Sequence, residues 1–214
     1  KWGYINVKGV MKINPQFYET RSFHDGLAAV RIKSKWGFID TTGKIVITPI
    51  FKRVHNFSED LASVKYKGKW GIIDKNGKWI LEPTYDYIDL FIEGFARIRQ
   101  NGDWGWLNKQ GKVIVPPNNE GLERFSNGLA RIKNNGKWKY VDSAGINPFN
   151  NSFINAEDFV EDVARVKSGE KWGYIKRDGT PLFSKTFNHV YDYNSGIARV
   201  KDNDIWFFIN LSGN

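Results

Sequence analysis

Short apolar runs alternate with turn-forming polar residues along the whole chain, and the pattern restarts every 34 residues. The clearest copy covers residues 68–100, with β-rich runs at 70–74, 78–81 and 95–99. Asp74 and Gly77 bound a tight turn between the first two runs, and Pro83 is expected to end the second strand. Residues 85–91 are irregular or form a short extra strand. Each copy is therefore predicted to be an antiparallel meander of three strands, or of four short ones.

Three residue types keep this period in register across the chain. The tryptophan column comprises Trp2, Trp36, Trp70, Trp104, Trp138, Trp172 and Trp206. Seven residues after each tryptophan stand Gly9, Gly43, Gly77, Gly111, Gly145, Gly179 and Gly213, and 26 residues after it stand Ala28, Ala62, Ala96, Ala130, Ala164 and Ala198. This predicts one array over residues 1–214, with units starting near 1, 35, 69, 103, 137 and 171 and a partial seventh from 205.

The predicted fold is an all-β, open and curved array of six units plus a terminal strand. A helical repeat of the same period is excluded, because the recurring glycine and proline positions leave no window long enough for two helices. A closed six-bladed propeller is the alternative. The open form is favoured because the chain begins and ends on the same strand, at Trp2 and Trp206, which leaves one strand spare.

The motif K-W-G-x-I-D-x-x-G-K-x-[V/I]-I-x-P, followed by F-x-x-G-L-A-x-V-K, resembles the bacterial WG repeats, also called KWG repeats. The resemblance covers the whole chain and is closest at residues 35–49 and 69–83. The fifth unit departs from it, with Lys139 in place of glycine and with Asn147 and Pro148 breaking the second strand. The resemblance implies a bacterial β-repeat module of envelope-associated or multidomain proteins, and it implies no catalytic residues.

Composition narrows the range of functions. The hydrophobic content of 41% supports a packed core, and the absence of cysteine excludes disulfides, thiolate metal sites and cysteine nucleophiles. No apolar run is long enough to cross a membrane, so no membrane insertion is expected in this segment. The compartment stays open between exported or envelope-associated and cytoplasmic. A net charge of +9 favours acidic partners.

Basic residues recur in the third predicted strand, at the positions 27 and 29 after each tryptophan. Strand geometry places both positions on one face, opposite the recurrent alanine. This basic ladder predicts either a solvated surface or a binding track for a polyanion, and no aromatic residue is expected among its members. Its members are Arg31, Lys65, Arg97, Arg99, Arg131, Lys133, Arg165, Lys167, Arg199 and Lys201.

The tryptophan column is expected to pack between neighbouring units, with a stacking surface for sugars or bases as the alternative. Trp79 and Trp106 lie off the column and are the candidates for exposed, ligand-facing aromatics. Asp40, Asp74 and Asp142 are expected to cap their own turns rather than to bind calcium, since asparagine replaces them in other units.

No catalytic constellation or cofactor motif is present in the sequence. The three histidines fall in different columns, which predicts no metal site. The acidic cluster at residues 157–162 is expected to be a solvated loop. We therefore expect a non-enzymatic protein without cofactor that acts as a scaffold for binding another protein. Electrostatic binding of an anionic polymer, nucleic acid or anionic glycan, is the first alternative, and carbohydrate binding through exposed aromatics is the second.

Overall fold

The computed structural model describes residues 1–214, and all of its regular elements are β-strands. None of its elements is a helix that could cross a membrane. The chain divides into two compact units, residues 1–117 and residues 118–214, which are described separately below.

The N-terminal unit contains one two-stranded and three four-stranded antiparallel sheets. The two-stranded sheet is formed by β1 (Trp2–Ile5) and β2 (Met11–Phe17). The first four-stranded sheet comprises β3 (Glu19–His24), β4 (Leu27–Ile32), β5 (Lys35–Ile39) and β6 (Ile45–Phe51). The second comprises β7 (Arg53–Val54), β8 (Leu61–Tyr66), β9 (Lys69–Asp74) and β10 (Trp79–Tyr85). The third comprises β11 (Tyr87–Ile88), β12 (Phe95–Gln100), β13 (Asp103–Asn108) and β14 (Val113–Asn119).

The C-terminal unit contains three sheets of three strands each. They are β15 (Gly121–Leu122), β16 (Leu129–Asn134), β17 (Lys137–Asp142); β18 (Asn155–Ala156), β19 (Val163–Ser168), β20 (Lys171–Lys176); and β21 (His189–Val190), β22 (Ile197–Asp202), β23 (Ile205–Asn210). Each sheet lacks the fourth strand that the larger sheets of the N-terminal unit have. The sequence-based prediction that Asn147 and Pro148 break this strand is confirmed for the fifth unit.

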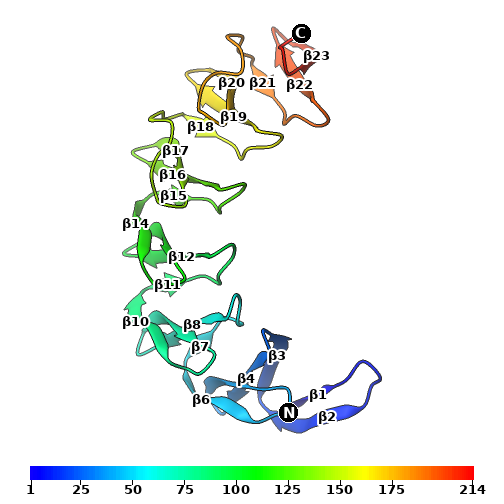
Figure 1. Ribbon diagram of the computed structural model, residues 1–214, viewed down its shortest axis with the longest axis vertical. Helices are drawn as coiled ribbons and strands as arrows, with labels where there is room; N and C mark the ends of the chain where they lie inside the picture. The colour runs from blue at the N-terminus through cyan, green and yellow to red at the C-terminus, as the bar shows by residue number, and fades with distance from the viewer. The chain divides into compact units, whose positions relative to one another are not determined.

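Each sheet is a meander that joins the second half of one sequence unit to the first half of the next. Within each part of the chain, Figure 1 shows the sheets following one another in sequence order. No sheet closes into a barrel, and the all-β array of tandem repeats predicted from the sequence is confirmed. The sequence predicted three or four strands per meander, and three of the sheets in the N-terminal unit have four.

Two-residue hairpin turns connect the second strand of each meander to its neighbours. Their central residues have positive φ angles, for example Glu59 (55°) with Asp60 (68°) and Lys67 (47°) with Gly68 (92°), which is the type I′ conformation. The longer turn after β9 is capped by Asp74, whose carboxylate accepts hydrogen bonds from the backbone N–H groups of Asn76 and Lys78, both at 2.9 Å. This confirms the capping role expected for the turn aspartates.

Pro83 does not end a strand, contrary to the sequence-based prediction. It lies inside β10, which continues to Tyr85. The proline is tolerated because β10 is the outer strand of its sheet and because the register with β9 shifts between Leu81 and Tyr85. The outer strand comes very close to β9: a Cβ atom added to Gly71 would lie 2.5 Å from the Leu81 carbonyl oxygen.

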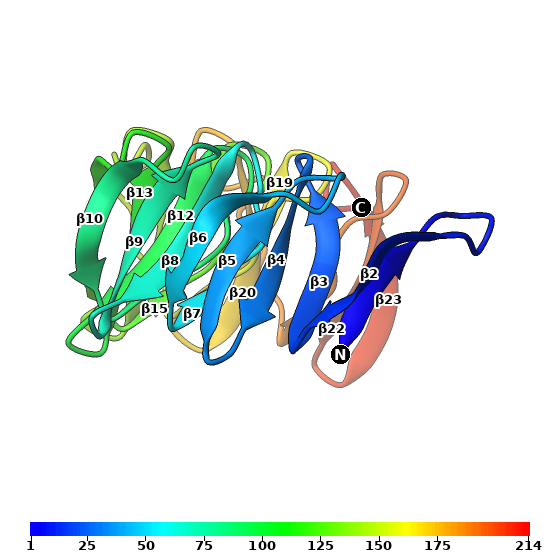
Figure 2. The same ribbon diagram turned by 90° about the horizontal axis from the view of Figure 1, so that it is seen from below.

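The hydrophobic core consists of layers between successive sheets within each unit. One layer joins Phe38 and Phe51 of the first four-stranded sheet to Phe57 and Val64 of the second, and Figure 2 shows these strands side by side. The recurrent alanine is completely buried, as Ala28 and Ala96 illustrate, so a larger side chain has no room between the sheets. A sheet that lies between two others of the same unit therefore has both faces packed against neighbours.

Candidate functional site

The basic ladder lies on the same sheet face as the tryptophan column. In β12 and β13, Arg97 pairs across the strands with Trp106, and Arg99 pairs with Trp104. Directly opposed residues of an antiparallel pair project their side chains from the same face. No aromatic residue stands among the ladder's own members, as expected, but tryptophans lie beside them on the same face. These tryptophans belong to the neighbouring strand rather than to the strand that carries the ladder.

Three arginines of the ladder are used in bonds within their own unit of the chain. Arg97 donates from Nε and Nη2 to Asp89, at 3.2 and 2.9 Å. Arg131 donates to Asp158 at 2.8 Å, and Arg165 donates to Asp192 at 2.6 Å. The last two bonds join one repeat to the next, so Arg131 and Arg165 link neighbouring repeats through ion pairs.

Arg131 and Arg165 each make a second kind of bond between repeats, to a backbone carbonyl of the following repeat. Arg131 donates to the Ala156 oxygen, and Arg165 donates to the Val190 oxygen at 3.1 Å. Both acceptors stand 18 residues after their tryptophan. The acidic residues at 157–162, expected to form a solvated loop, take part in these bonds as well, because Glu157 also contacts Arg131.

The remaining members of the ladder differ in their surroundings. Arg199 is exposed and lies over two rings, with its guanidinium carbon 4.3 Å from the Tyr191 centroid and 4.9 Å from the Trp206 centroid. Arg99 and Lys133 lie over Trp104 and Trp138 respectively. The other members are half-buried beside the tryptophan column; they are Arg31, Lys65, Lys167 and Lys201.

The two off-column tryptophans are not the exposed aromatics that were expected. Trp106 is only 3% exposed, and Trp79 packs against Phe51 and Tyr66 with centroids 6.0 and 6.3 Å apart. The sequence contained the relevant signal for Trp106. It stands two residues after a column tryptophan, where other units have buried aromatics such as Phe38 and Tyr140.

Between successive column tryptophans the structure forms a groove that the sequence did not reveal. The N-terminal groove has a volume of about 380 Å³ and lies between Trp36 and Trp70. Arg21 lies over Trp36 at 5.0 Å and donates to the Val54 oxygen at 2.8 Å. The complete lining is Arg21, Trp36, Arg53, Val54, His55, Trp70 and Tyr87.

An equivalent groove of about 450 Å³ lies between Trp172 and Trp206 of the C-terminal unit. Its lining is Arg165, Trp172, His189, Val190, Tyr191, Lys201 and Trp206. His189 stacks on Trp206 at 6.3 Å, as His55 stacks on Trp70 at 4.9 Å in the N-terminal groove. Arg165 makes the same bond to a carbonyl 18 residues after a tryptophan that Arg21 makes in the other groove.

Burial controls the protonation of several groups near these grooves. The pKa of His55 is lowered, chiefly by burial, with Asp89 acting in the opposite direction and Arg21 adding to the decrease. The imidazole is therefore neutral at pH 7. Burial also raises the pKa of Tyr174, whose hydroxyl donates to the Tyr191 oxygen at 2.7 Å and supports the wall of the C-terminal groove.

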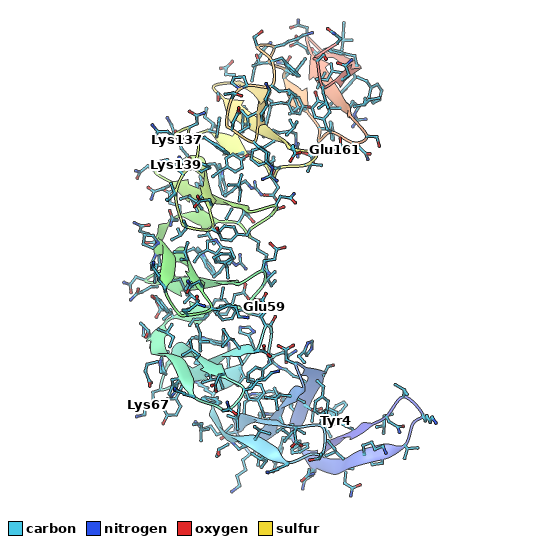
Figure 3. All side chains as sticks on the ribbon, viewed as in Figure 1. Tyr4, Glu59, Lys67, Lys137, Lys139 and Glu161 are labelled. Atoms are coloured by element: carbon cyan, nitrogen blue, oxygen red, sulfur yellow. The ribbon has the colours of Figure 1, made fainter.

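The hairpin tips carry a different set of bonds between repeats. The Glu59 carboxylate accepts from the Gly94 N–H at 3.0 Å, and Glu161 accepts from Ser195 at 2.6 Å and from Gly196 at 3.0 Å. In each part of the chain, Figure 3 shows these glutamates at loop tips, on the opposite edge of the sheets from Lys67 and Lys137. Carboxylates at the tips therefore connect successive repeats.

No cluster of three or more histidine, aspartate or glutamate side chains is arranged to hold a metal ion. His24 lies in β3, whereas His55 and His189 line the N-terminal and C-terminal grooves.

The repeat geometry agrees with the comparison with known families. The profile described as "WG containing repeat" matches residues 2–36, 36–70, 70–103, 104–138, 153–172 and 172–206. The chain belongs to the WG repeat family. The gap in the matched ranges, residues 139–152, coincides with the segment in which the WG repeat loses its fourth strand. No curated protein sequence matches the chain.

Several solved structures are similar to this chain at low sequence identity and low TM-score. Kluyveromyces lactis Hsv2 is 12% identical, with a TM-score of 0.39 over 87% of this chain and 71% of that protein. A eukaryotic initiation factor is 12% identical, with a TM-score of 0.45 over 84% of this chain and 58% of the other. PorZ of Porphyromonas gingivalis is 9% identical, with a TM-score of 0.39 over 92% of this chain and 32% of the other.

Proposed function

We propose that this WG repeat chain is a non-catalytic scaffold that binds another protein through the grooves between successive column tryptophans. The observation that carries the proposal is the recurrence of a groove between successive column tryptophans, lined by tryptophan, histidine and arginine, in both parts of the chain. A repeat array presents such a surface several times at fixed spacing, which suits an extended partner.

The residue types in the groove favour a protein partner. Tryptophan, tyrosine and arginine are the side chains most enriched at the energetic centres of protein interfaces. In the C-terminal groove Tyr191 and Trp206 are about half exposed, at 47% and 46%, and Arg199 lies between them and solvent. These side chains are held in place by mutual stacking, so binding would cost little additional side-chain entropy.

Recognition of an anionic polymer is the second candidate function, supported by the net charge of +9 and by arginine stacked on tryptophan. The pairing of Arg97, Arg131 and Arg165 with carboxylates argues against it, because a polyanion would have to displace these acids.

The test is photocrosslinking with a benzophenone side chain at position 191, followed by measurement of binding to the purified crosslinked partner. Trp206→Ala and Arg199→Ala should each weaken binding by about tenfold or more, the usual effect of truncating an interface anchor. The matched control is Trp2→Ala, which removes an exposed tryptophan that lines neither groove. Equal binding by all three variants would contradict the proposed use of the groove.

Salt distinguishes the two candidates. Affinity for a protein partner should change mildly between 50 and 200 mM salt, whereas polyanion affinity falls log-linearly and by about 10³ or more. A steep log-linear fall, together with crosslinks to nucleic acid or an anionic glycan, would replace the protein-binding proposal with the second candidate.

A further inference from the structure

The N-terminal and C-terminal grooves differ in their charged residues, including one acidic position. In the C-terminal unit the acids that neutralise Arg131 and Arg165 are Asp158 and Asp192, each 20 residues after its tryptophan. The corresponding residue beside the N-terminal groove is Asn56. Asparagine has a similar shape but carries no charge, so the N-terminal groove lacks the carboxylate that the C-terminal groove supplies to itself.

At the N-terminal groove Ala29 occupies the position of Arg165, and Arg21 reaches the equivalent carbonyl from outside the arginine column. Its Nη1 donates to the Val54 oxygen, and its guanidinium lies over Trp36, but it forms no ion pair. Burial lowers the pKa of Arg21, and the nearby Glu19 carboxylate acts in the opposite direction. A guanidinium keeps its charge under these conditions and gains most from a planar, bidentate anion.

The neighbouring acids are already bound elsewhere. Glu19 contacts Arg31, and Asp89 accepts two bonds from Arg97. Arg53, the second cation in the groove lining, also forms no ion pair.

We infer that the N-terminal groove is a carboxylate-binding site that takes an aspartate or glutamate side chain of an acidic, aromatic-bearing peptide segment. Arg21 and Arg53 would hold the carboxylate, and Trp36, Trp70 and Tyr87 would contact the flanking aromatic residues. The size of the anion follows from the other repeats, where a single aspartate carboxylate occupies the corresponding place. This inference rests on the proposed function of the grooves, and it names the chemistry of the partner at one of them.

Two substitutions exchange the charged position between the grooves. Asn56→Asp should supply an internal carboxylate and close the N-terminal site. Asp192→Asn should reproduce in the C-terminal groove the arrangement found around Arg21, and open a second site there. The two changes are matched, since each replaces a side chain by the one that the equivalent repeat already contains.

The experiment titrates an end-blocked Gly-Tyr-Glu-Tyr-Gly peptide, and its Gln counterpart, into the isotope-labelled chain and follows side-chain NMR signals. We expect the Glu peptide to bind about tenfold or more tightly than the Gln peptide and to shift the Arg21 Nε and Trp36 indole signals. Asn56→Asp should abolish the preference. Asp192→Asn should add shifts at Arg165 and Trp206.

Three results would overturn the inference. They are equal affinity for the Glu and Gln peptides, absence of binding by both, and displacement of the Glu peptide by a tighter-binding oligothymidylate. The proposed function would fail separately, through loss of any effect of Trp206→Ala on the crosslinked partner. The carboxylate site can therefore fail while the groove remains a protein-binding surface.

Discussion

The two parts of the chain share one strand pattern but differ in how each sheet ends. In the N-terminal unit the fourth strand lies directly against the strand that carries Trp-Gly, and a Cβ atom on Gly37 would lie 2.4 Å from the Ile47 oxygen. In the C-terminal unit the corresponding segments form loops, and a Cβ atom on Gly173 would meet only the Thr186 Cγ2 at 3.6 Å.

This comparison gives a physical reason for the glycine after each tryptophan. A side chain cannot be accommodated at this position where an outer strand with its proline crosses at this distance. Glycine is not required where the outer strand is missing. The fifth unit fits this reason, because Lys139 replaces the glycine there and the fourth strand is absent from the same sheet.

The largest expected difference between the two parts concerns the column tryptophans. Trp70 is 4% exposed in the second hydrophobic layer, whereas Trp206 is 46% exposed on the last strand. Trp70→Ala should lower the free energy of unfolding by about 3–5 kcal/mol, and Trp206→Ala by about 1 kcal/mol. Urea unfolding followed by circular dichroism measures both. Equal losses would mean that the two tryptophans are equally enclosed, as in a closed ring.

The next effect tests the glycine directly. Gly71→Ala would place a Cβ atom against the Leu81 oxygen and displace β10, so we expect a loss of about 3 kcal/mol. Gly173→Ala meets no such obstacle and should change the free energy of unfolding by less than about 0.5 kcal/mol. An equal loss of free energy of unfolding in Gly173→Ala and Gly71→Ala would contradict the proposed difference between the two parts.

A smaller difference is expected for the bond that joins one repeat to the next. In the C-terminal unit this bond is made by Arg131, and removal of its guanidinium leaves Asp158 and the Ala156 oxygen without their donor. In the N-terminal unit the same position is Ser63, whose hydroxyl donates to the Asp89 oxygen at 2.7 Å. We expect a loss of about 2–3 kcal/mol for Arg131→Ala and about 1 kcal/mol for Ser63→Ala in urea unfolding. An unchanged free energy of unfolding in Arg131→Ala would show that the ladder is only a solvated face.

The sequence was sufficient to predict the repeat, the meander and the turns, because these depend on local residue types at a fixed spacing. It correctly placed the ladder and the recurrent alanine on opposite faces. It did not show that both faces are covered by neighbouring sheets, since strand alternation distinguishes two faces without identifying which one contacts solvent. For this reason Arg131 was predicted to be a surface residue, although its side chain bonds to the following repeat.

The grooves were beyond sequence reasoning for a related reason. Arg21 lies outside the arginine column, yet it donates to a carbonyl at the position equivalent to the one that Arg165 bonds in the following repeat. Only the placement of a side chain against the following repeat reveals this equivalence. One signal was available and was missed: the change from Asp192 and Asp158 to Asn56 at a fixed distance from the tryptophan.

The smallest expected effect is a dependence of stability on acid that the two parts should share. Asp40 and Asp178 each accept a hydrogen bond at 2.6 Å from a threonine hydroxyl two residues later, and this bond is the main cause that lowers the pKa of both carboxyls. A carboxyl with a lowered folded-state pKa contributes stability above its unfolded pKa. That contribution is lost as the pH falls from about 4 through the folded-state value. Asp40→Asn and Asp178→Asn keep the backbone caps but cannot titrate, so their urea midpoints should fall less between about pH 4 and 2 than that of the unmodified chain.

Asp74→Asn is the control, because its turn has Asn76 where the other two have threonine. The effect is small because both carboxyls are solvent-exposed and water screens the interaction. An acid response that is the same in all three variants and in the unmodified chain would show that the threonine bond does not contribute to folding.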